Sequence, residues 1–527
     1  MTARLPSPYS NYAYAVLTSQ ARRAPDAVAV TQPGRGDVTY AELDARVNQR
    51  AYALASTGVQ AGTRVAALLS DPMAIIELYL AQAKLGAVTA AMNPYWPDDV
   101  LAAVSETTGC QAFVYDTGTA AAVSRVRGRL PQINSWLHMG GPADGALDLD
   151  ALTASAPMDP PALGADGEDP LALFFTSGTT GLPKAVVHTH ASATAVAQIW
   201  LDIPRSPGGA LATGPIIWGV GFAVIAGPAL YGGMRLILAP AFGPAELLQL
   251  AASERVTHIS VIPSFFAQLF SDERHRDADL SSLEVIMLGA EPLLPSLLER
   301  IRARLPQAAV YSYYGATEAP YSCWARQGER TGALSASGRA RTGGAVRVVD
   351  SEGARVVGEI GEIQLTGPHV MTGYDNRPEQ TAAVLRDGWY VGGDLGVVDE
   401  AGVLTVLGRR EDAIRKLGRW ALPSEVEDAA LALEGIAEAG AVGVPEDGYE
   451  QQILLAVVPR EGAAVDADSV RARLSTLAEE SRPDVVVVVS ELPHANDASG
   501  GRGKLLRREI RSRWGSVLAG ESAGRTQ

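Results

Sequence analysis

Cysteine is almost absent from this chain of 527 residues, which contains Cys110 and Cys323 and no others. Two cysteines cannot form a disulfide framework, and their separation rules out a CxxC metal site. Such scarcity is compatible with a reducing compartment, where disulfides are rare. We therefore expect a cytoplasmic protein.

Positive charge is also scarce, because the chain has 44 Lys and Arg residues against 59 Asp and Glu residues. Its net charge is -15. Nucleic-acid-binding proteins gather Lys and Arg against the phosphate backbone, so an acidic chain is a poor candidate for that class. The N-terminus lacks a basic segment followed by an apolar core. We therefore expect no secretion signal.

The sequence offers no uninterrupted apolar run that suits a membrane helix. Residues 206–234 carry no charged side chain, but they include three prolines and eight glycines. These residues break a helix repeatedly. We interpret the stretch as short buried elements beside an interior cavity and expect no membrane span.

The first part of the chain alternates between helix and strand patterns. Thr39 and Glu42 have the spacing of a capping box at the start of a helix. Residues 65–69 form an apolar run typical of a strand, and Asp71 and Pro72 suit the first turn of a second helix. A further apolar run follows that helix. This order predicts a parallel sheet with right-handed crossovers.

The length of the chain indicates more than one domain. Residues 116–170 are rich in Ala, Gly, Pro and Asp, and we expect a loop-rich connection there. The pattern changes near residue 408. We therefore predict an α/β protein with a large domain at residues 1–408, built from parallel-rich sheets and flanking helices, and a small mobile α+β domain at residues 409–527.

The small domain has its own pattern of elements. Ser424 and Glu427 have the spacing of another capping box. Strands are expected at residues 453–458 and 485–489, with a helix between them, and a flexible loop is expected at residues 495–503.

The strongest local motif is LFFTSGTTGLPK at residues 173–184. An apolar strand leads into a loop of glycines and hydroxyl residues, and a lysine follows. Glycines let the backbone approach an anion closely, hydroxyl and N–H groups donate hydrogen bonds, and Lys184 adds charge. The motif differs from a Walker A loop in its glycine spacing and in having Ala185 after the lysine. The loop is therefore expected to bind a polyphosphate.

Further motifs in a fixed order give the chain a specific family resemblance. They are YGATE at 314–318, WYVGGDLG at 389–396, GRRED at 408–412 and GKLLR at 503–507. Together with residues 173–184, this set resembles the adenylate-forming superfamily of acyl-CoA synthetases, adenylation domains and luciferases. The chain is most similar in style to free-standing acyl- or aryl-CoA ligases.

The resemblance implies where ATP would bind. Asp394 would accept hydrogen bonds from the ribose hydroxyls, with Arg409 beside it, and Tyr314 would stack on adenine. The phosphate contacts would come from Thr176, Ser177, Gly178, Thr179, Thr180, Gly181 and Lys184, and the wall around adenine from Gly289, Ala290, Glu291 and Pro292. Tyr313 and Gly315 would also belong to the nucleotide site.

The resemblance also implies the reaction and its catalytic residues. A carboxylate would attack the α-phosphate of ATP to give an acyl-adenylate and pyrophosphate. Two anions must then meet, so the site must supply positive charge. Lys504 would bridge the carboxylate and the α-phosphate, Thr317 would contact the α-phosphate, and Glu318 would bind Mg²⁺, a hard cation that prefers oxygen ligands.

A second step would follow after the small domain rotates about a hinge at Glu411. A thiol would then attack the adenylate, and CoA or the phosphopantetheine of a separate carrier protein could supply it. The tract GRWALPSEVE at residues 418–427 resembles acyl- and aryl-CoA ligases. Trp420 could contact the thiol or simply anchor an interface.

The acid would bind where the resemblance places the acyl pocket, at Trp218, Gly219, Gly221 and Phe222. Apolar neighbours favour an uncharged acyl body, either a flat aryl acid or a medium alkyl chain. Most of these residues could equally pack the core. His188 and His190 follow the phosphate loop, and we assign neither to catalysis.

Two departures from the family pattern leave alternatives open. Gly392 stands where Thr is usual, and Arg415 where Lys is frequent. The main prediction is an AMP-forming acid–thiol ligase that uses ATP, Mg²⁺ and CoA. The alternatives are an enzyme that loads a separate carrier protein, an enzyme that adenylates another oxyanion such as nitrite for diazotisation, and a non-catalytic nucleotide-binding regulator.

Overall fold

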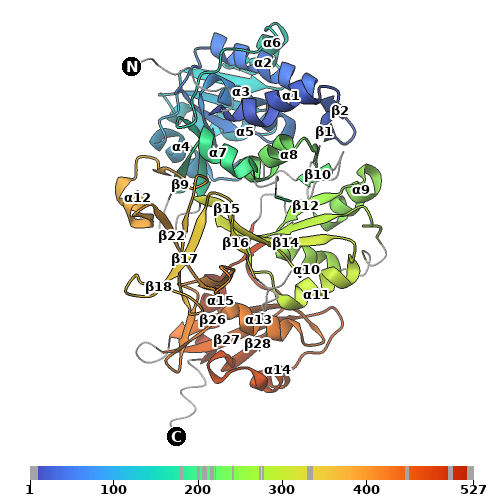
Figure 1. Ribbon diagram of the computed structural model, residues 1–527, viewed down its shortest axis with the longest axis vertical. Coiled ribbons are helices and arrows are strands. Elements are labelled where there is room, and N and C mark those ends of the chain that lie inside the picture. Colours follow the sequence, from blue (N-terminus) through green and yellow to red (C-terminus); the bar gives the residue numbers. More distant parts are fainter. Residues whose placement is uncertain are drawn as a thin grey trace.

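A computed structural model describes residues 10–176, 182–198, 202–203, 210–213, 219, 221–239, 243–271, 275, 278–328, 336–445, 450–496 and 502–518. Figure 1 shows the N-terminal elements at one end of an elongated molecule and the C-terminal elements at the other. Within the described residues, no helix combines the length and apolar character needed to cross a membrane. The fold is mixed α/β, as predicted.

One mixed sheet fills the N-terminal end of the molecule. Its strand order is β20 (Gly373–Tyr374), β9 (Lys184–Thr189), β8 (Pro170–Thr176), β4 (Val88–Ala91), β3 (Arg64–Leu68), β5 (Ala112–Asp116), β6 (Ser135–Met139) and β7 (Leu147–Asp148). Its accompanying helices are α2 (Tyr40–Ser56), α3 (Pro72–Leu85), α4 (Asp98–Thr107), α5 (Ala120–Val126), α6 (Leu149–Ala154) and α7 (His190–Ala197).

Local signals define this region as predicted. Thr39 and Glu42 form the capping box of α2. The Asp71 side chain caps α3, which ends at Gly86 in a left-handed conformation. Strands β3 and β4 pair in parallel. The predicted strand, helix and strand are therefore confirmed.

The prediction of a loop-rich connection over residues 116–170 was wrong. Strands β6 and β7 extend the sheet there, and α5 and α6 pack beside them. Leu137, Met139 and Leu149 are buried in the same core as the preceding strands. Short apolar segments of this kind gain their stability from the sheet that they extend, so their local pattern is weak.

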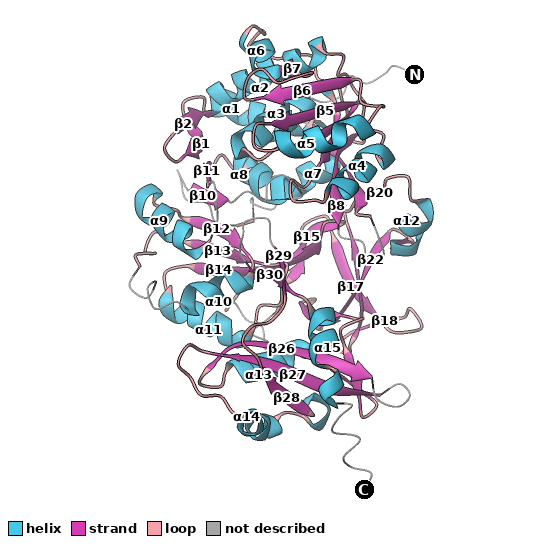
Figure 2. Cartoon of the chain, turned by 180° about the vertical axis from the view of Figure 1, so that it is seen from behind, coloured by secondary structure: helices cyan, strands magenta, loops and turns pink. Residues whose placement is uncertain are grey.

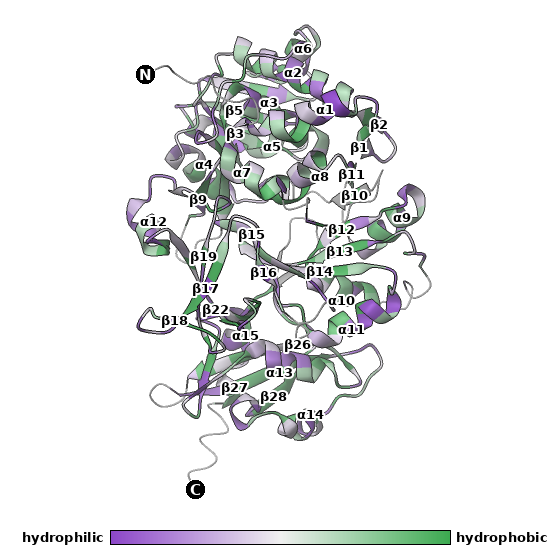
Figure 3. Cartoon of the chain, in the orientation of Figure 1, coloured by the Kyte–Doolittle hydropathy of each residue, from purple (hydrophilic) through white to green (hydrophobic). Residues whose placement is uncertain are grey.

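A second sheet crosses the middle of the molecule, with buried apolar strands between helices that are polar on their outer faces, as Figure 3 shows for α11. The order is β16 (Arg339–Ala340), β15 (Ala319–Arg326), β14 (Ala309–Ala316), β13 (Val285–Leu288), β12 (His258–Val261), β10 (Ala210–Thr213), β11 (Arg235–Leu238), β1 (Val28–Gln32) and β2 (Gly36–Thr39). The helices are α1 (Ser19–Arg23), α8 (Gly227–Tyr231), α9 (Pro244–Glu254), α10 (Pro263–Ser271) and α11 (Pro295–Arg304).

A third, antiparallel sheet connects this region to the C-terminal end. It contains β18 (Arg355–Val356), β17 (Ala345–Val349), β19 (Gly361–Thr366), β22 (Trp389–Val398) and β21 (Leu385–Arg386), and β23 (Leu404–Arg409) pairs with β22. Helix α12 (Pro378–Val384) lies between β20 and β21 in the chain. Strand β23 ends at the GRRED motif, so the last strand of this sheet leads directly to the predicted hinge.

The C-terminal region has its own apolar core around β26 (Ile436–Pro445), β27 (Gln451–Pro459) and β28 (Val485–Val488). Helices α13 (Pro423–Leu431), α14 (Ala467–Arg473) and α15 (Arg507–Trp514) pack around these strands. Two hairpins complete it, β24 (Ile414–Lys416) with β25 (Arg419–Ala421), and β29 (His494–Asn496) with β30 (Arg502–Leu505).

The predicted capping box at Ser424 was wrong. Helix α13 begins at Pro423, and its cap residue Leu422 makes no side-chain hydrogen bond. Proline suits the first helical position because its fixed φ is already helical. The Glu427 side chain bonds Arg507 and the Ala441 N–H, so it is engaged elsewhere.

Candidate active site

The phosphate-loop motif connects the antiparallel strands β8 and β9, which place Thr176 opposite Lys184. Ser177, Gly178, Thr179, Thr180 and Gly181 lie outside the described residues. The Lys184 Nζ stands 4.9 Å above the centre of the Tyr374 ring. This cation–π contact fixes one positive charge at the end of the loop.

Tyr374 also contacts the carboxylate of Glu318. The Tyr374 hydroxyl donates a hydrogen bond of 2.7 Å to Glu318 Oε1, and Glu318 is buried. Burial, followed by the charge of Glu318, raises the pKa of Tyr374, so its hydroxyl stays protonated. One ring therefore joins Lys184 and Glu318, and the sequence analysis did not identify it.

A second polar group combines Tyr314 with Asp394 and Arg409. The Tyr314 hydroxyl donates to Asp394 Oδ2 over 2.6 Å, and Arg409 Nε lies 3.1 Å from Asp394 Oδ1. Register places Asp394 opposite Arg409 across β22 and β23. These contacts orient a buried carboxylate beside a guanidinium, as the proposed ribose contact requires.

The unusual Gly392 lies close to this group. Arg409 Nη1 donates to the Gly392 carbonyl over 2.8 Å. A Cβ at residue 392 would lie 3.0 Å from the Tyr390 hydroxyl, which is closer than normal packing allows. The side chain that the family pattern would place here is therefore replaced by the ring of Tyr390.

Strands β13 and β14 run parallel. The GAEP segment after β13 and the YGATE segment at the end of β14 therefore lie at the same edge of the sheet. A Cβ at Gly289 would lie 2.2 Å from the Tyr313 ring, so only glycine fits. Ala290 has a left-handed φ of 65°, and Glu291 accepts a hydrogen bond from the Ser264 N–H over 3.1 Å. The carboxyl ends of parallel strands are the usual place for a ligand crevice in an open α/β sheet.

His188 contacts the backbone of the YGATE turn. Its Nε2 lies 2.7 Å from the Thr317 carbonyl and its Nδ1 3.1 Å from Ser192 Oγ. Burial lowers the pKa of His188 to about 4, so the ring is neutral and donates to the carbonyl. His190 is likewise buried and accepts the Tyr12 N–H. Both rings are therefore buried and contact neighbouring backbone groups.

The hairpin that carries Lys504 projects from the C-terminal region toward β14 and β15 (Figures 1 and 2). Strand β30 contains the Lys504 backbone, while its side chain lies outside the described part of the chain. Arg507, just after the hairpin, donates to both oxygens of buried Glu427 over 2.7 and 2.8 Å. Both bonds come from Nη2, and this charge-assisted contact ties the base of the hairpin to α13.

The predicted hinge residue Glu411 is exposed and lies 3.4 Å from Arg508. Neighbouring Arg410 pairs with Glu362 of β19 over 2.9 Å. Ion pairs between exposed side chains contribute little stability. The exposed pair of Glu411 and Arg508 therefore adds little to the stability of the segment after β23.

The predicted acyl-pocket residues are only partly described. Trp218 lies outside the described residues, whereas Gly219, Gly221 and Phe222 are within them. The Phe222 ring is buried, edge-on to Tyr79 at 4.9 Å and tilted against Tyr12 at 6.0 Å. These contacts place Phe222 in the core around α8.

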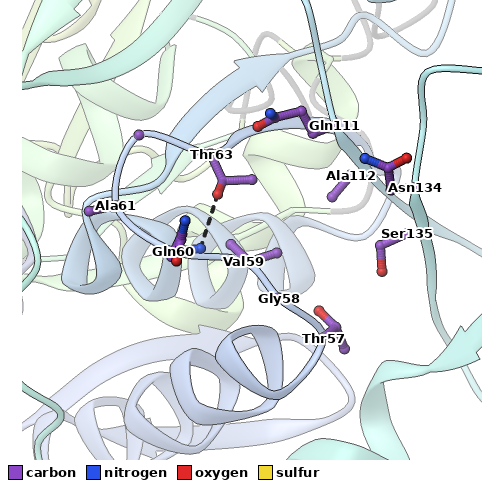
Figure 4. A pocket seen from close by; sticks show the side chains of 11 residues that line it. Thr57, Gly58, Val59, Gln60, Ala61, Thr63, Gln111, Ala112, Asn134 and Ser135 are labelled. Atoms are coloured by element: carbon purple, nitrogen blue, oxygen red, sulfur yellow. Dashed lines mark hydrogen bonds between the residues drawn. The ribbon is translucent and has the colours of Figure 1, made fainter.

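A polar cavity of about 390 Å³ lies elsewhere, in the N-terminal sheet (Figure 4). It is lined by residues 57–63 together with Gln111, Ala112, Asn134 and Ser135. These residues precede or begin β3, β5 and β6, so the cavity is at the amino ends of the strands. None of its lining side chains is charged, and it suits a nucleotide triphosphate poorly.

Comparison with known proteins identifies the class. The chain matches the AMP-binding enzyme family over residues 17–375 and the AMP-binding enzyme C-terminal domain over residues 425–499. It therefore belongs to the AMP-binding enzymes, within the adenylate-forming superfamily.

Individual relatives show which enzymes of this family the chain is similar to. A feruloyl-CoA synthase from Amycolatopsis sp. is 33% identical, over 94% of this chain and 98% of the relative. A 3-hydroxybenzoate–CoA ligase from Aromatoleum sp. (strain CIB) is 29% identical, over 90% and 92%. The ATP-bound crystal structure of MatB from Rhodopseudomonas palustris superposes with a TM-score of 0.86 at 26% identity, covering 96% of this chain and 99% of that one. The predicted class, an AMP-forming acid–thiol ligase, agrees with these similarities.

Proposed function

We propose that this enzyme activates an aryl carboxylic acid with ATP and transfers the acyl group to the thiol of CoA. The observation that carries the proposal is a pair of polar groups, each of which includes a side chain of the YGATE segment. Lys184, Tyr374 and Glu318 stand beside the phosphate loop, while Tyr314, Asp394 and Arg409 suit a ribose. An aryl acid is favoured because the similar ligases named above act on feruloyl and hydroxybenzoyl groups.

In the first step, the carboxylate oxygen attacks the α-phosphorus, and the bond to the bridging oxygen of pyrophosphate breaks. Lys184 holds charge on the departing phosphates, and Thr317 and Lys504 are the residues proposed to contact the α-phosphate. Positive groups fixed in advance stabilise the charge that accumulates between two anions. The hydrogen bonds around Asp394 orient the ribose, which fixes the α-phosphorus for in-line attack.

Mg²⁺ fits the residues present, with Glu318 as its protein ligand. Glu318 is a buried carboxylate next to the phosphate loop. Among the described residues, no group of three or more His, Cys, Asp or Glu side chains could enclose a metal. Mg²⁺ needs no such cage, because one carboxylate with phosphate oxygens and water satisfies it. When bound, Mg²⁺ neutralises charge on the phosphates.

In the second step, we propose that residues 409–527 rotate against residues 1–408 about Glu411. The thiolate sulfur attacks the acyl carbonyl, and AMP leaves with the oxygen that came from the acid. A separate carrier protein is the alternative source of the thiol.

An ATP–pyrophosphate exchange assay over a panel of aryl and alkyl acids tests the proposal. We expect exchange with aryl acids, and thioester formation once CoA is added. Lys504→Ala should abolish exchange while sparing thioester formation from a supplied adenylate. Absence of exchange with every acid would instead favour a non-catalytic nucleotide-binding protein, and exchange only with nitrite would favour diazotisation.

A further inference from the structure

Helix α11 begins without a cap of its own. Its cap residue is Leu294, whose side chain makes no hydrogen bond, and Pro295 occupies the first turn. The first N–H groups of a helix need an acceptor from outside the helix. Leucine cannot supply one, so the acceptor must come from another part of the chain.

Asp428 of α13 supplies this acceptor. Its Oδ1 accepts hydrogen bonds from the Ser296 N–H over 3.3 Å and from Ser296 Oγ over 2.6 Å. Helices α11 and α13 lie against each other (Figure 1). A carboxylate at this position also complements the positive end of the helix dipole. The cap crosses the proposed hinge, because α11 precedes Glu411 and α13 follows it.

We propose that Asp428 is a positioning residue that caps α11 only while the C-terminal region is docked as it is here, and so favours the orientation that makes the adenylate. This inference rests on the proposed two-step function. In the docked orientation the β29–β30 hairpin stands toward β14 and β15. Rotation for thiol transfer separates α13 from α11 and leaves the Ser296 N–H without this acceptor.

Two arginines of like charge also interact across this interface. Arg300 lies four residues after Ser296, and its pKa is lowered by burial and then by the positive charge of Arg460. Arg460 follows β27 in the C-terminal region and is exposed. The same interface therefore combines the Asp428 cap with a pair of like charges.

Three variants test this proposal. Asp428→Ala should lower the exchange rate about fivefold relative to the rate of thioester formation from supplied adenylate, as expected for loss of one cap. Asp428→Asn keeps an acceptor oxygen and should keep the ratio of the two rates within about twofold of the wild type. Arg460→Gln should shift the ratio the other way, most clearly at low salt, because salt screens the repulsion.

Asp466→Ala is the matched control. The Asp466 side chain caps α14 through the Ser469 N–H over 2.8 Å, entirely within the C-terminal region. It removes a cap of the same kind and should leave the ratio unchanged. An unchanged ratio in Asp428→Ala, whether or not both rates fall, would overturn the positioning role. Exchange by the wild type would still support the proposed function in that case. Loss of exchange in the wild type would contradict the function itself.

Discussion

Tyr374 shows how one side chain can connect two functional charges. Its ring lies under Lys184, and its hydroxyl bonds Glu318, which is 56 residues away in sequence. No local pattern indicates such a link, because Lys184 lies on β9, the strand paired with β20 of Tyr374, whereas Glu318 follows β14 of the second sheet. The lysine proposed to bind phosphate and the carboxylate proposed to bind magnesium therefore share one phenol as a contact.

Tyr374→Phe should separate these contacts. The ring under Lys184 remains, but Glu318 loses a hydrogen bond that contributes about 1–2 kcal/mol when buried. We expect the exchange rate to fall by roughly tenfold and its Mg²⁺ dependence to change, with little change in nucleotide affinity. Tyr374→Leu removes both contacts and should also weaken nucleotide binding. Identical kinetics for the two variants would contradict the separate roles.

Buried neutral histidines should make the protein sensitive to acid. Burial lowers the pKa of His188 and of His190 to about 4 and that of His369 to about 3, against 6.5 for an exposed histidine. Below pH 6.5 the unfolded chain binds protons that the folded chain does not. The contribution of these neutral histidines to the free energy of unfolding is therefore complete above pH 6.5 and is lost as pH falls toward 4.

The expected loss at pH 5 is of the order of 2 kcal/mol for His188 alone. Urea unfolding at pH 7.5 and pH 5 measures this loss as a difference in the free energy of unfolding. His188→Asn should show a smaller difference between the two pH values. A free energy of unfolding that does not change between these pH values would be inconsistent with buried neutral rings.

At the scale of elements, short-range signals predicted helix starts well and long-range contacts poorly. The α2 capping box and the α3 cap depend on residues within three positions, and both were predictable. The Ser424 prediction failed because Glu427 is engaged by Arg507, 80 residues away. The motif order located the candidate site, but the supporting contact of His188 with Thr317 spans 129 residues and was not predictable.

The Glu427–Arg507 pair should hold the β29–β30 hairpin in its position. Arg507→Met leaves Glu427 buried without its cation, which costs about 3–5 kcal/mol in comparable pairs. We expect a lower melting temperature and a loss of exchange much larger than any loss of thioester formation from supplied adenylate. Arg513→Met on the same helix breaks an exposed pair with Glu509 and should be nearly neutral. Equal loss of both activities in Arg507→Met would contradict a role in placing the hairpin.

At the scale of the whole molecule, one active site must serve two reactions with different geometric needs. The Asp428 cap belongs to the docked state, and the exposed Glu411–Arg508 pair near the proposed hinge contributes little to holding it. The fold class follows from the alternation of strands and helices along the sequence. The orientation of the two regions does not, because it depends on contacts between surfaces that no local pattern specifies.

Glu411→Pro should restrict this motion. Proline fixes φ near -65° and so limits rotation at the hinge. We expect thioester formation to fall by roughly tenfold or more, while exchange falls less. Glu411→Ala removes the same ion pair with Arg508 without restricting φ, and it should leave both steps close to wild type. An unchanged thioester rate in Glu411→Pro would place the hinge elsewhere.

The passage of one oxygen atom from the acid to AMP is the most direct sign of an acyl-adenylate. An accepted aryl acid with oxygen-18 in its carboxylate is converted with ATP and CoA, and the nucleotide product is analysed by mass spectrometry. We predict AMP that carries one labelled oxygen for each thioester formed, and unlabelled pyrophosphate. Formation of ADP with label in inorganic phosphate would contradict adenylation.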